Sequence, residues 1–464
     1  MTVRIYYDKM RLVELILPIS FFRRNVMDIT LIAKSGVMTA EIQKAIDTCF
    51  LSGGGKIILE AGEYLTGGLR LRSNCTLYLK SGAALKGTRE MEDYKILEKE
   101  TLEPIDEDYK TDVLWTPART RTTNHHIVKV ASSWNNALLR ILDAENVAII
   151  GEEGSVIDGS DPYDPKGEEY YRGPHGIAYH YSKNLHFEGY TIKNTGNWAH
   201  IGYKSQNIEY KNIEILGGHD GIHNSSCDNF TIEDSAFYTG DDCVAGFDNY
   251  NVIVRNCVLN SACSGMRFGG ADILVDNCRF FGPAKYFFRG SLSLEDKIAG
   301  NPSPKSGRTN MLALFTYYSD FTLDVRRMPG NITVRNCTVE NCDRFLHFDF
   351  TGTHVWQKNK PLTSIAFENI EAKGIAMPFN AYGDRENPLT LVLENCGIAF
   401  SSKVDCAIRS GNFSLIKVES TVFENVEGAL IKSYGEPGRI EAQNVLGVNE
   451  IVTVTDEPFV SKSI

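Results

Sequence analysis

Three aspartates near the middle of the chain have the residue type and the spacing of a general acid–base site. Asp220 and Asp242 lie 22 residues apart, and Asp241 directly precedes the second of them. If the backbone returns to the same place with this period, the three carboxyl groups share one patch. Such a patch is electrostatically unfavourable unless one group holds a proton or a ligand. A protonated carboxyl group beside an ionised one is the pair that acid–base catalysis requires.

A second interpretation of the same aspartates is structural. Aspartate is common in turns, where its side chain faces water and hydrogen-bonds the local backbone. The three residues taken alone favour neither interpretation. The decision depends on whether the surrounding sequence repeats with the period that separates Asp220 from Asp242.

The sequence around the aspartates does repeat with this period. Short strand-like runs start at positions that differ by 23, 22, 22 and 21 residues, namely Asn184, Asn207, Asn229, Asn251 and Asp272. A second series runs with the first and consists of Asn212-Ile213, Asp234-Ser235, Asn256-Cys257 and Asn277-Cys278. The same phrase returns in residues 331–337 and 391–396. Each unit combines a few β-favouring residues with a turn rich in Asn, Asp, Ser and Gly.

A repeat of about 22 residues made only of short strands predicts an all-β fold, a right-handed parallel β-helix or solenoid. Leucine-rich repeats share the period, but their leucine spacing is absent, and a propeller needs repeats of roughly 40 residues. Successive coils stack about 4.8 Å apart, so Asp220 and Asp242 should occupy one column with Asp241 beside them. The cysteines that recur in the repeat are expected to stack inside the core.

The two ends of the repeat region and its interruptions complete the predicted architecture. Residues 39–50 should form a capping helix that protects the open end of the solenoid, with Thr39 as N-cap and an apolar face formed by Ile42, Ala45, Ile46, Cys49 and Phe50. Two insertions, 92–136 and 283–330, are expected to emerge as long loops on the binding face. The alternative is that they are surface excursions without function. We predict one β-helix domain over residues 28–464, preceded by an extension of uncertain status in residues 1–27.

Composition and charge exclude several classes of protein. The chain has 464 residues, 42% of them hydrophobic and 23% charged, which is ordinary for a folded domain and unlike a disordered chain. The net charge of −11 argues against nucleic acid as a partner. No run approaches the roughly 18 apolar residues of a membrane span. None of the eleven cysteines forms a C-x-x-C pair, so a thiolate metal site has no support.

The amino-terminal segment 1–26 bears on the cellular location. The apolar stretch 12–22 follows Lys9 and Arg11, as in a signal peptide, but Glu14 and Pro18 interrupt it and no small-x-small cleavage site follows. We therefore expect a cytoplasmic protein. Secretion is the alternative if residues 1–26 act as a signal. The sequence does not indicate the oligomeric state.

The motifs around the aspartates resemble those of glycoside hydrolase family 28, the polygalacturonases and their relatives in the pectin-lyase-like β-helix superfamily. The family hallmarks are N-T-D, then G-D-D about 20 residues later, then G-H-G and R-x-K. In this chain Gly218-His219-Asp220 stands at the first position, and Gly240-Asp241-Asp242 matches the second. The segments 53–79 and 193–198 are also similar to the family. The resemblance spans roughly residues 36–280 and extends more loosely over the rest.

The resemblance implies an inverting glycoside hydrolase that needs no cofactor or metal. Asp241 would be the acid that protonates the leaving oxygen, while Asp220 and Asp242 would orient the attacking water. Inversion asks for the acid and the base to stand about 6.5–9.5 Å apart. The implied substrate is a pectin-derived oligosaccharide or a related polysaccharide that contains uronate or rhamnose. The long insertions could close one end of the groove, and the action is therefore expected to be exo.

Several positions depart from the family pattern. His219 replaces the asparagine of the first motif, and the expected G-H-G falls on Cys263-Ser264-Gly265. The R-x-K motif has no clear counterpart; its candidates are Arg267, Arg289, Lys305 and Arg308. The residues expected to contact substrate are His175, Trp198, His219, His223, Ser264, Arg267, Arg289 and Arg308. Each has a structural alternative, since such histidines often only support a carboxylate, a lone tryptophan is more often core, and arginines often form surface ion pairs.

Two other functions stay open from the sequence. A lyase or epimerase on the same scaffold would abstract the proton beside a uronate carboxylate with a Lys, Arg, His or Tyr base, often with calcium. A carbohydrate-binding protein without catalysis would explain the missing G-H-G histidine, although the aspartate trio counts against it. His347, Asp349 and His354 are metal-ligand types, but their spacing does not support a site.

Overall fold

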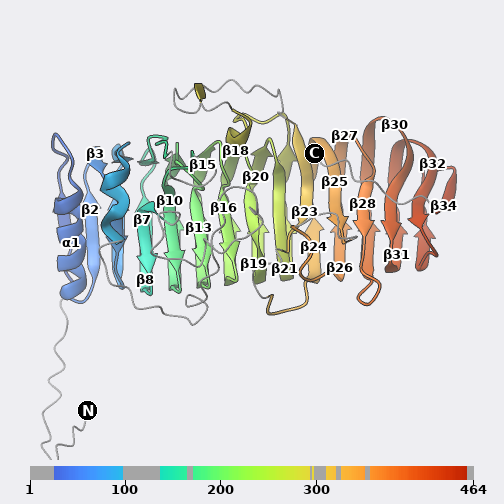
Figure 1. Cartoon of the computed structure of the whole chain (residues 1–464), viewed down its shortest axis with the longest axis horizontal. Helices are drawn as coiled ribbons and strands as arrows, with labels where there is room; N and C mark the ends of the chain where they lie inside the picture. Colours follow the sequence, from blue (N-terminus) through green and yellow to red (C-terminus); the bar gives the residue numbers. More distant parts are fainter. Residues whose placement is uncertain are drawn as a thin grey trace, which may run out of the picture.

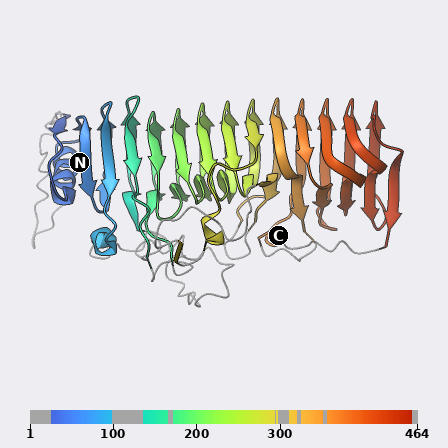
Figure 2. The ribbon, with the colours of Figure 1, turned by 90° about the horizontal axis from the view of Figure 1, so that it is seen from above.

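The computed structural model describes residues 26–97, 136–164, 171–292, 295–296, 310–319, 325–350 and 356–456. Arg308, Lys305 and His354 lie outside these ranges, as do residues 1–25 of the predicted extension and most of the insertion 92–136. Within the described residues, the strands follow one another along a single long axis (Figure 1). The same row of strands is seen from above in Figure 2.

The strands form three parallel ladders that together make a right-handed parallel β-helix, which confirms the predicted fold. Ladder 1 contains β4 (Leu69–Leu71), β7 (Ala137–Leu142), β10 (His175–His180), β13 (His200–Tyr203), β16 (Ile222–Ser225), β23 (Met311–Tyr317), β28 (Phe379–Tyr382) and β34 (Glu450–Thr455). Ladder 2 contains β1 (Ile29–Leu31), β2 (Gly55–Leu59), β5 (Cys75–Leu79), β8 (Glu145–Gly151), β11 (Lys183–Glu188), β14 (Gln206–Lys211), β17 (Asp228–Glu233), β24 (Gly330–Arg335), β26 (Ser364–Glu368), β29 (Leu389–Glu394), β31 (Phe413–Glu419) and β33 (Arg439–Gln443).

Ladder 3 contains β3 (Gly62–Thr66), β6 (Ala83–Gly87), β9 (Val156–Asp158), β12 (Thr191–Lys193), β15 (Glu214–Gly217), β18 (Ala236–Thr239), β20 (Val258–Ser261), β22 (Arg279–Phe281) and β27 (Glu371–Ile375). Five longer strands bend from one ladder into the next, namely β19 (Val244–Arg255), β21 (Ser264–Asp276), β25 (Thr338–Asp349), β30 (Gly397–Gly411) and β32 (Val422–Tyr434). Because every pairing between these strands is parallel, each coil places its residues over the equivalent residues of the coil before it.

The register agrees with the period found in the sequence. In ladder 1, Ile222 pairs with Val244 and Val244 pairs with Met266, so one coil has the same length as the spacing between Asp220 and Asp242. Residues that alternate along each strand point inward and form one continuous apolar core. All eleven cysteines are free. Ten of them are buried, as the cysteine column predicted, and Cys263 is partly exposed.

The recurring asparagines at the strand starts have a structural explanation. Asn184, Asn207, Asn229 and Asn251 all adopt positive φ, between 53° and 57°, a conformation that asparagine tolerates better than most residues. Their side-chain amides form a ladder in which Asn207 donates to Asn184 at 2.9 Å and Asn229 donates to Asn207 at 3.3 Å. The repeated letter in the sequence thus marks both a left-handed turn and a stack of amide hydrogen bonds.

A pair of substitutions at Asn207 separates these two contributions. Asn207→Gly keeps the positive φ accessible and removes only the amide hydrogen bonds, whereas Asn207→Ala also places a Cβ in the left-handed region. We expect the alanine variant to be less stable than the glycine variant by about 1 kcal/mol. Urea unfolding of the two variants measures the difference, and equal stabilities would show that the backbone conformation does not matter here.

The solenoid begins under a capping helix, α1 (Thr39–Leu51), as predicted. Ile42, Ala45, Ile46 and Cys49 are buried against the first coil, whereas Phe50 is 39% exposed and was wrongly assigned to the apolar face. The predicted N-cap is also wrong by one residue, because Met38 occupies that position without a side-chain hydrogen bond. The Thr39 hydroxyl instead accepts a hydrogen bond from the Gly67 amide at 2.7 Å, which ties the helix to the coil below.

Candidate active site

The three aspartates lie together just ahead of the ladder 1 strands β16 and β19, as their spacing predicted. The Gly221 amide donates to the Asp242 carbonyl at 2.9 Å, and the Cys243 amide donates to the Ser264 carbonyl at 3.1 Å. Asp220, Asp242 and Ser264 therefore occupy one column on three successive coils. Trp198 stands one coil before Asp220 in the same column, since the Ala199 amide donates to the Asp220 carbonyl at 3.0 Å.

Backbone hydrogen bonds hold the three carboxyl groups close to one another. The Asp242 amide donates to Oδ1 of Asp220 and to Oδ1 of Asp241, at 3.2 Å in each case. Oδ1 of Asp242 accepts in turn from the Ser264 amide at 2.9 Å. Asp220 and Asp242 are only 3% and 1% exposed, and the Asp241 side chain is 13% exposed. The interpretation as solvated turn aspartates is therefore wrong.

Burial raises the pKa of all three carboxyl groups. Desolvation, together with the neighbouring Asp220 carboxylate, raises the pKa of Asp241 to about 7. The pKa values of Asp220 and Asp242 are raised too, chiefly by burial and then by the nearest partner carboxylate. Arg267 opposes the rise at all three aspartates, and Arg172 opposes it at Asp220 and Asp241. The trio consequently holds protons well above the pH at which an exposed aspartate is ionised.

The raised pKa of Asp241 predicts a pH-dependent stability. Its folded-state pKa of about 7 exceeds the ordinary value of 3.8, so the folded protein binds this proton more tightly than the unfolded chain. Stability from this group is complete below pH 3.8 and is lost as the pH rises towards 7. Asp241→Asn removes the titration, and we expect the variant to gain on the order of 3 kcal/mol relative to the parent between pH 4 and pH 8. Thermal unfolding across this range measures the gain, and parallel pH curves for the two proteins would contradict the assignment.

His223 contacts Asp220 directly, and Trp198 packs against His223. Nδ1 of His223 lies 2.8 Å from Oδ2 of Asp220, and burial lowers the pKa of His223 to about 3, which keeps the ring neutral as a hydrogen-bond donor. The Trp198 ring stacks on the His223 ring with centroids 3.9 Å apart, and His175 packs at 5.4 Å on Trp198. Trp198 is 7% exposed and His175 is 1% exposed. Both side chains pack against neighbouring rings, and their role as substrate contacts stays a prediction.

Arg267 reaches the trio from the coil after Asp242. Its Nη1 lies 3.5 Å from Oδ2 of Asp242, and its guanidinium packs on the rings of both Tyr318 and Trp356, at 4.2 and 4.8 Å from their centroids. The same Oδ2 atom accepts no hydrogen bond from the described residues. Ser264, at the position of the missing histidine, pairs its hydroxyl with Thr316 at 3.0 Å. Asp242 thus keeps one carboxylate oxygen for a bound molecule.

His219 lies between two arginines on the Asp241 side of the trio. Its Nδ1 is 3.2 Å from Nη1 of Arg172, and its Nε2 is 3.4 Å from Nη1 of Arg289. Arg289 comes from the insertion 283–330, within the short helix η5 (Arg289–Ser291), and its amide donates to the Gly218 carbonyl at 3.1 Å. A Cβ at Gly240 would collide with the Phe287 carbonyl, so this motif glycine lets the insertion pack onto the site. The described part of the insertion therefore packs against both aspartate motifs.

Sequence reasoning missed four residues of this region. Arg172 and Asn197 are buried and hydrogen-bonded to each other. Cys263 lies next to two of the aspartates, and the Tyr318 ring packs against the Arg267 guanidinium. Asn197 belongs to the segment 193–198 that resembles the family, and this was the available signal. Arg172 precedes its strand outside the repeat, and no spacing marked it. Cys263 occupies the place before Ser264, in the altered third motif.

Asp241, Asp242 and Cys263 bring possible ligand atoms close together. One such atom from each of the three residues lies within 4.8 Å of the others. Within the described residues this is the one group with a metal-like arrangement. The guanidinium groups of Arg172 and Arg267, at 4.0 and 3.5 Å from the carboxylates, would repel a cation there.

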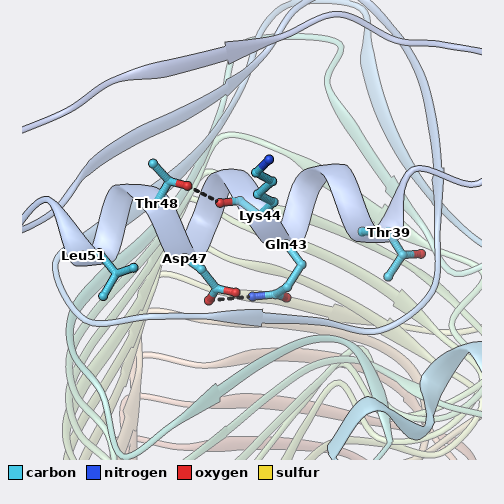
Figure 3. Close-up of a pocket in the computed structure, with 7 residues that line it drawn as sticks. Thr39, Gln43, Lys44, Asp47, Thr48 and Leu51 are labelled. Carbon is cyan, nitrogen blue, oxygen red and sulfur yellow. Dashed lines mark hydrogen bonds between the residues drawn. The ribbon is translucent and has the colours of Figure 1, made fainter.

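Other parts of the structure offer less. A hollow on the outer side of α1 is lined by Thr39, Gln43, Lys44, Asp47, Thr48 and Leu51 (Figure 3). It contains none of the residues with a predicted catalytic or binding role. In the ranges that the structure describes, no helix combines the length and the apolar character needed to cross a membrane.

Comparison with known proteins confirms the resemblance noted in the motifs. The model of the glycosyl hydrolases family 28 matches residues 115–270. A protein named "Probable polygalacturonase" from Vitis vinifera is 26% identical over 211 residues, which are 43% of this chain and 39% of that protein. The chain thus spans well under half of this curated relative. The aspartate motifs lie inside the region that the family model matches.

Solved structures share the fold over almost the whole length. A hyperthermoactive exopolygalacturonase from Thermotoga maritima superposes with a TM-score of 0.57 at 18% identity and covers 93% of both chains. PfbA, a surface adhesin of Streptococcus pneumoniae, superposes with a TM-score of 0.53 at 13% identity and covers 91% of both chains. Because an enzyme and an adhesin share this architecture, the fold does not decide between catalysis and binding. That decision depends on the site.

Proposed function

We propose that this relative of the family 28 glycosyl hydrolases cleaves O-glycosidic bonds in a pectin-derived oligosaccharide, with inversion and from one end of the chain. The observation that carries the proposal is the trio of buried carboxyl groups, in which the pKa of Asp241 is raised to about 7. A carboxyl group that titrates near neutrality can donate a proton to a leaving oxygen and be replenished from water. An adhesin has no need for such a group.

The geometry suggests how the proton transfers are divided. Asp241 gives its proton to the glycosidic oxygen as the bond to the anomeric carbon breaks. Oδ2 of Asp242, which accepts no hydrogen bond from the described residues, takes a proton from the attacking water. Asp220 is held by the His223 ring at 2.8 Å and by the Asp242 amide at 3.2 Å, and it shares in orienting that water. Each turnover consumes one water and leaves Asp241 ionised and Asp242 protonated. Loss of the Asp242 proton to solvent and uptake of a solvent proton by Asp241 restore the starting state.

Exo action is supported by how the insertion approaches the site. Phe287 and Arg289 pack onto Gly218 and Gly240, the residues that open the two aspartate motifs. A segment seated there covers the start of both aspartate motifs, and a long polymer crossing the site would have to pass it. The likeness to an exopolygalacturonase points the same way.

A panel of oligosaccharides made of galacturonate or of alternating galacturonate and rhamnose tests the proposal. We expect one small product to be released from one chain end, with no ladder of internal fragments. Chromatography of the products follows this directly. Random internal cuts would contradict the exo mode, and a product that absorbs through a new unsaturated bond would identify a lyase. Binding without any turnover across the panel would identify a carbohydrate-binding protein.

A further inference from the structure

A buried group of hydrogen-bond donors lies beside Asp241, and the mechanism above leaves it without a task. We call Arg172, Asn197, His219 and Arg289 the donor cluster; their exposed fractions are 7%, 1%, 3% and 5%. We propose that the donor cluster binds the carboxylate of a uronate ring next to the bond that is cleaved. This inference rests on the proposed function for the sugar at Asp241, and it adds Arg172 and Asn197, which lie outside the four family motifs, to the residues that contact the carboxylate.

Asn197 contributes a donor that lacks a partner. Its Oδ1 accepts from Nη1 of Arg172 at 3.0 Å, and this contact fixes the orientation of the amide because the arginine can only donate. Nδ2 of Asn197 consequently points elsewhere, and it has no hydrogen-bond partner within the described part of the chain. A fully buried amide nitrogen in this state is costly unless a ligand accepts from it.

Arg289 contributes a second such donor. Its Nη1 forms an ion pair with Asp161 and also faces His219, while its Nη2 has no hydrogen-bond partner among the described residues. The guanidinium is nearly inaccessible to solvent, so bulk water does not satisfy this nitrogen. Arg289 and Asn197 therefore offer two unsatisfied donors to the same cluster from separate segments of the chain.

The charges in this region also call for an anion. Arg172 and Arg289 bring two positive charges, and Asp161 balances one of them. The acid Asp241, at 4.0 Å from Arg172, contributes no charge while it holds its proton. His219 does not supply the missing negative charge, because its imidazole is at most neutral. Both of its ring nitrogens face arginine donors, and a neutral imidazole accepts a hydrogen bond at only one of them. A carboxylate supplies both the missing charge and the planar acceptor geometry that guanidinium groups prefer.

A carboxylate bound here would also assist the acid. The charged groups and the thiol around Asp241 are Arg172, Arg267, Asp220, Asp242 and Cys263, and Arg172 lowers the pKa of Asp241. A substrate carboxylate beside Arg172 offsets this attraction and keeps Asp241 protonated until the glycosidic bond breaks. A neutral sugar gives no such assistance. The donor cluster would therefore select a uronate in the catalytic step as well as in binding.

Calorimetry with D-galacturonate and D-galactose tests the inference without requiring turnover. We expect the parent protein to bind galacturonate at least ten-fold more tightly than galactose, and Arg289→Gln to remove this difference. Arg279→Gln is the matched control, because that arginine is half-exposed and pairs with Glu340 rather than with the donor cluster. It should bind both sugars as the parent does. Equal binding of the two sugars by the parent, or an undiminished preference in Arg289→Gln, overturns the inference.

A second variant and a second anion guard this test. Should Arg289→Gln fail to fold because Asp161 loses its partner, Asp161→Asn combined with Arg289→Gln removes both charges, and circular dichroism reports the fold. Inorganic sulfate is the competing anion, and sulfate binding as tight as that of galacturonate would overturn a sugar-specific site. Hydrolysis limited to neutral oligosaccharides would leave the proposed hydrolase standing and remove the donor cluster from it. Selective galacturonate binding without any hydrolysis would support the donor cluster and contradict the proposed hydrolase.

Discussion

Replacing Asp241 with asparagine is expected to lower kcat on a pectic oligosaccharide by about 10³- to 10⁴-fold. The asparagine amide has almost the same shape as the protonated carboxyl group, but it cannot give a proton to the leaving oxygen. The hydrogen bond from the Asp242 amide can be kept by the new amide oxygen, and the fold should persist. Initial rates of product release, measured at equal concentrations of folded protein, provide the comparison.

The choice of leaving group shows whether Asp241 acts as the acid or only holds the site together. A glycoside with a good leaving group, such as p-nitrophenolate, departs without protonation, so Asp241→Asn should lose much less activity on it. Asp234→Asn is the matched control, since Asp234 is exposed and neighbouring coils carry asparagine at the same place in the repeat, as at Asn212 and Asn256. It should retain full activity on both substrates. Equal losses of Asp241→Asn on both substrates would remove the acid assignment.

The sequence predicted the parts of this molecule that depend on its period. The length of one coil is a property of the chain itself, and parallel pairing converts it directly into columns, so Asp220, Asp242 and Ser264 could be placed in one column from their spacing. The asparagine and cysteine series followed from the same rule. Where the period is constant, spacing along the chain is equivalent to position in space.

The period predicts nothing about segments that leave the coil. Arg289 and Arg308 were equal candidates in the insertion, and only tertiary packing on Gly218 and Gly240 decides that Arg289 reaches the site. Arg172 lies just ahead of β10 and outside the repeat, so no spacing in the sequence indicated its position. The separation of acid and base stays a prediction, because the period does not fix how the adjacent side chains of Asp241 and Asp242 turn relative to each other.

The close approach of Asp241 and Asp242 bears directly on the stereochemistry of the reaction. A distance of about 5 Å is typical of enzymes in which the second carboxylate attacks the sugar and configuration is retained, whereas inversion needs space for a water. We nevertheless expect inversion. The Asp242 amide donates to both Asp220 and Asp241, and Oδ2 of Asp242, which accepts no hydrogen bond from the described residues, lies 3.5 Å from the Arg267 guanidinium. An oxygen neutralised by a guanidinium is a weaker nucleophile towards carbon, yet it still orients water.

Asp242→Asn tests this role and is expected to lower kcat by about 10³-fold, since the attacking water loses the group that accepts its proton. Azide needs no such acceptor and should restore part of the turnover. The deciding measurement is nuclear magnetic resonance of the first product that the parent protein releases, before its anomers equilibrate. Inversion of the anomeric configuration assigns Asp242 to the water. Retention would make Asp242 the nucleophile and would turn the close approach of Asp241 and Asp242 into the basis of a two-step mechanism.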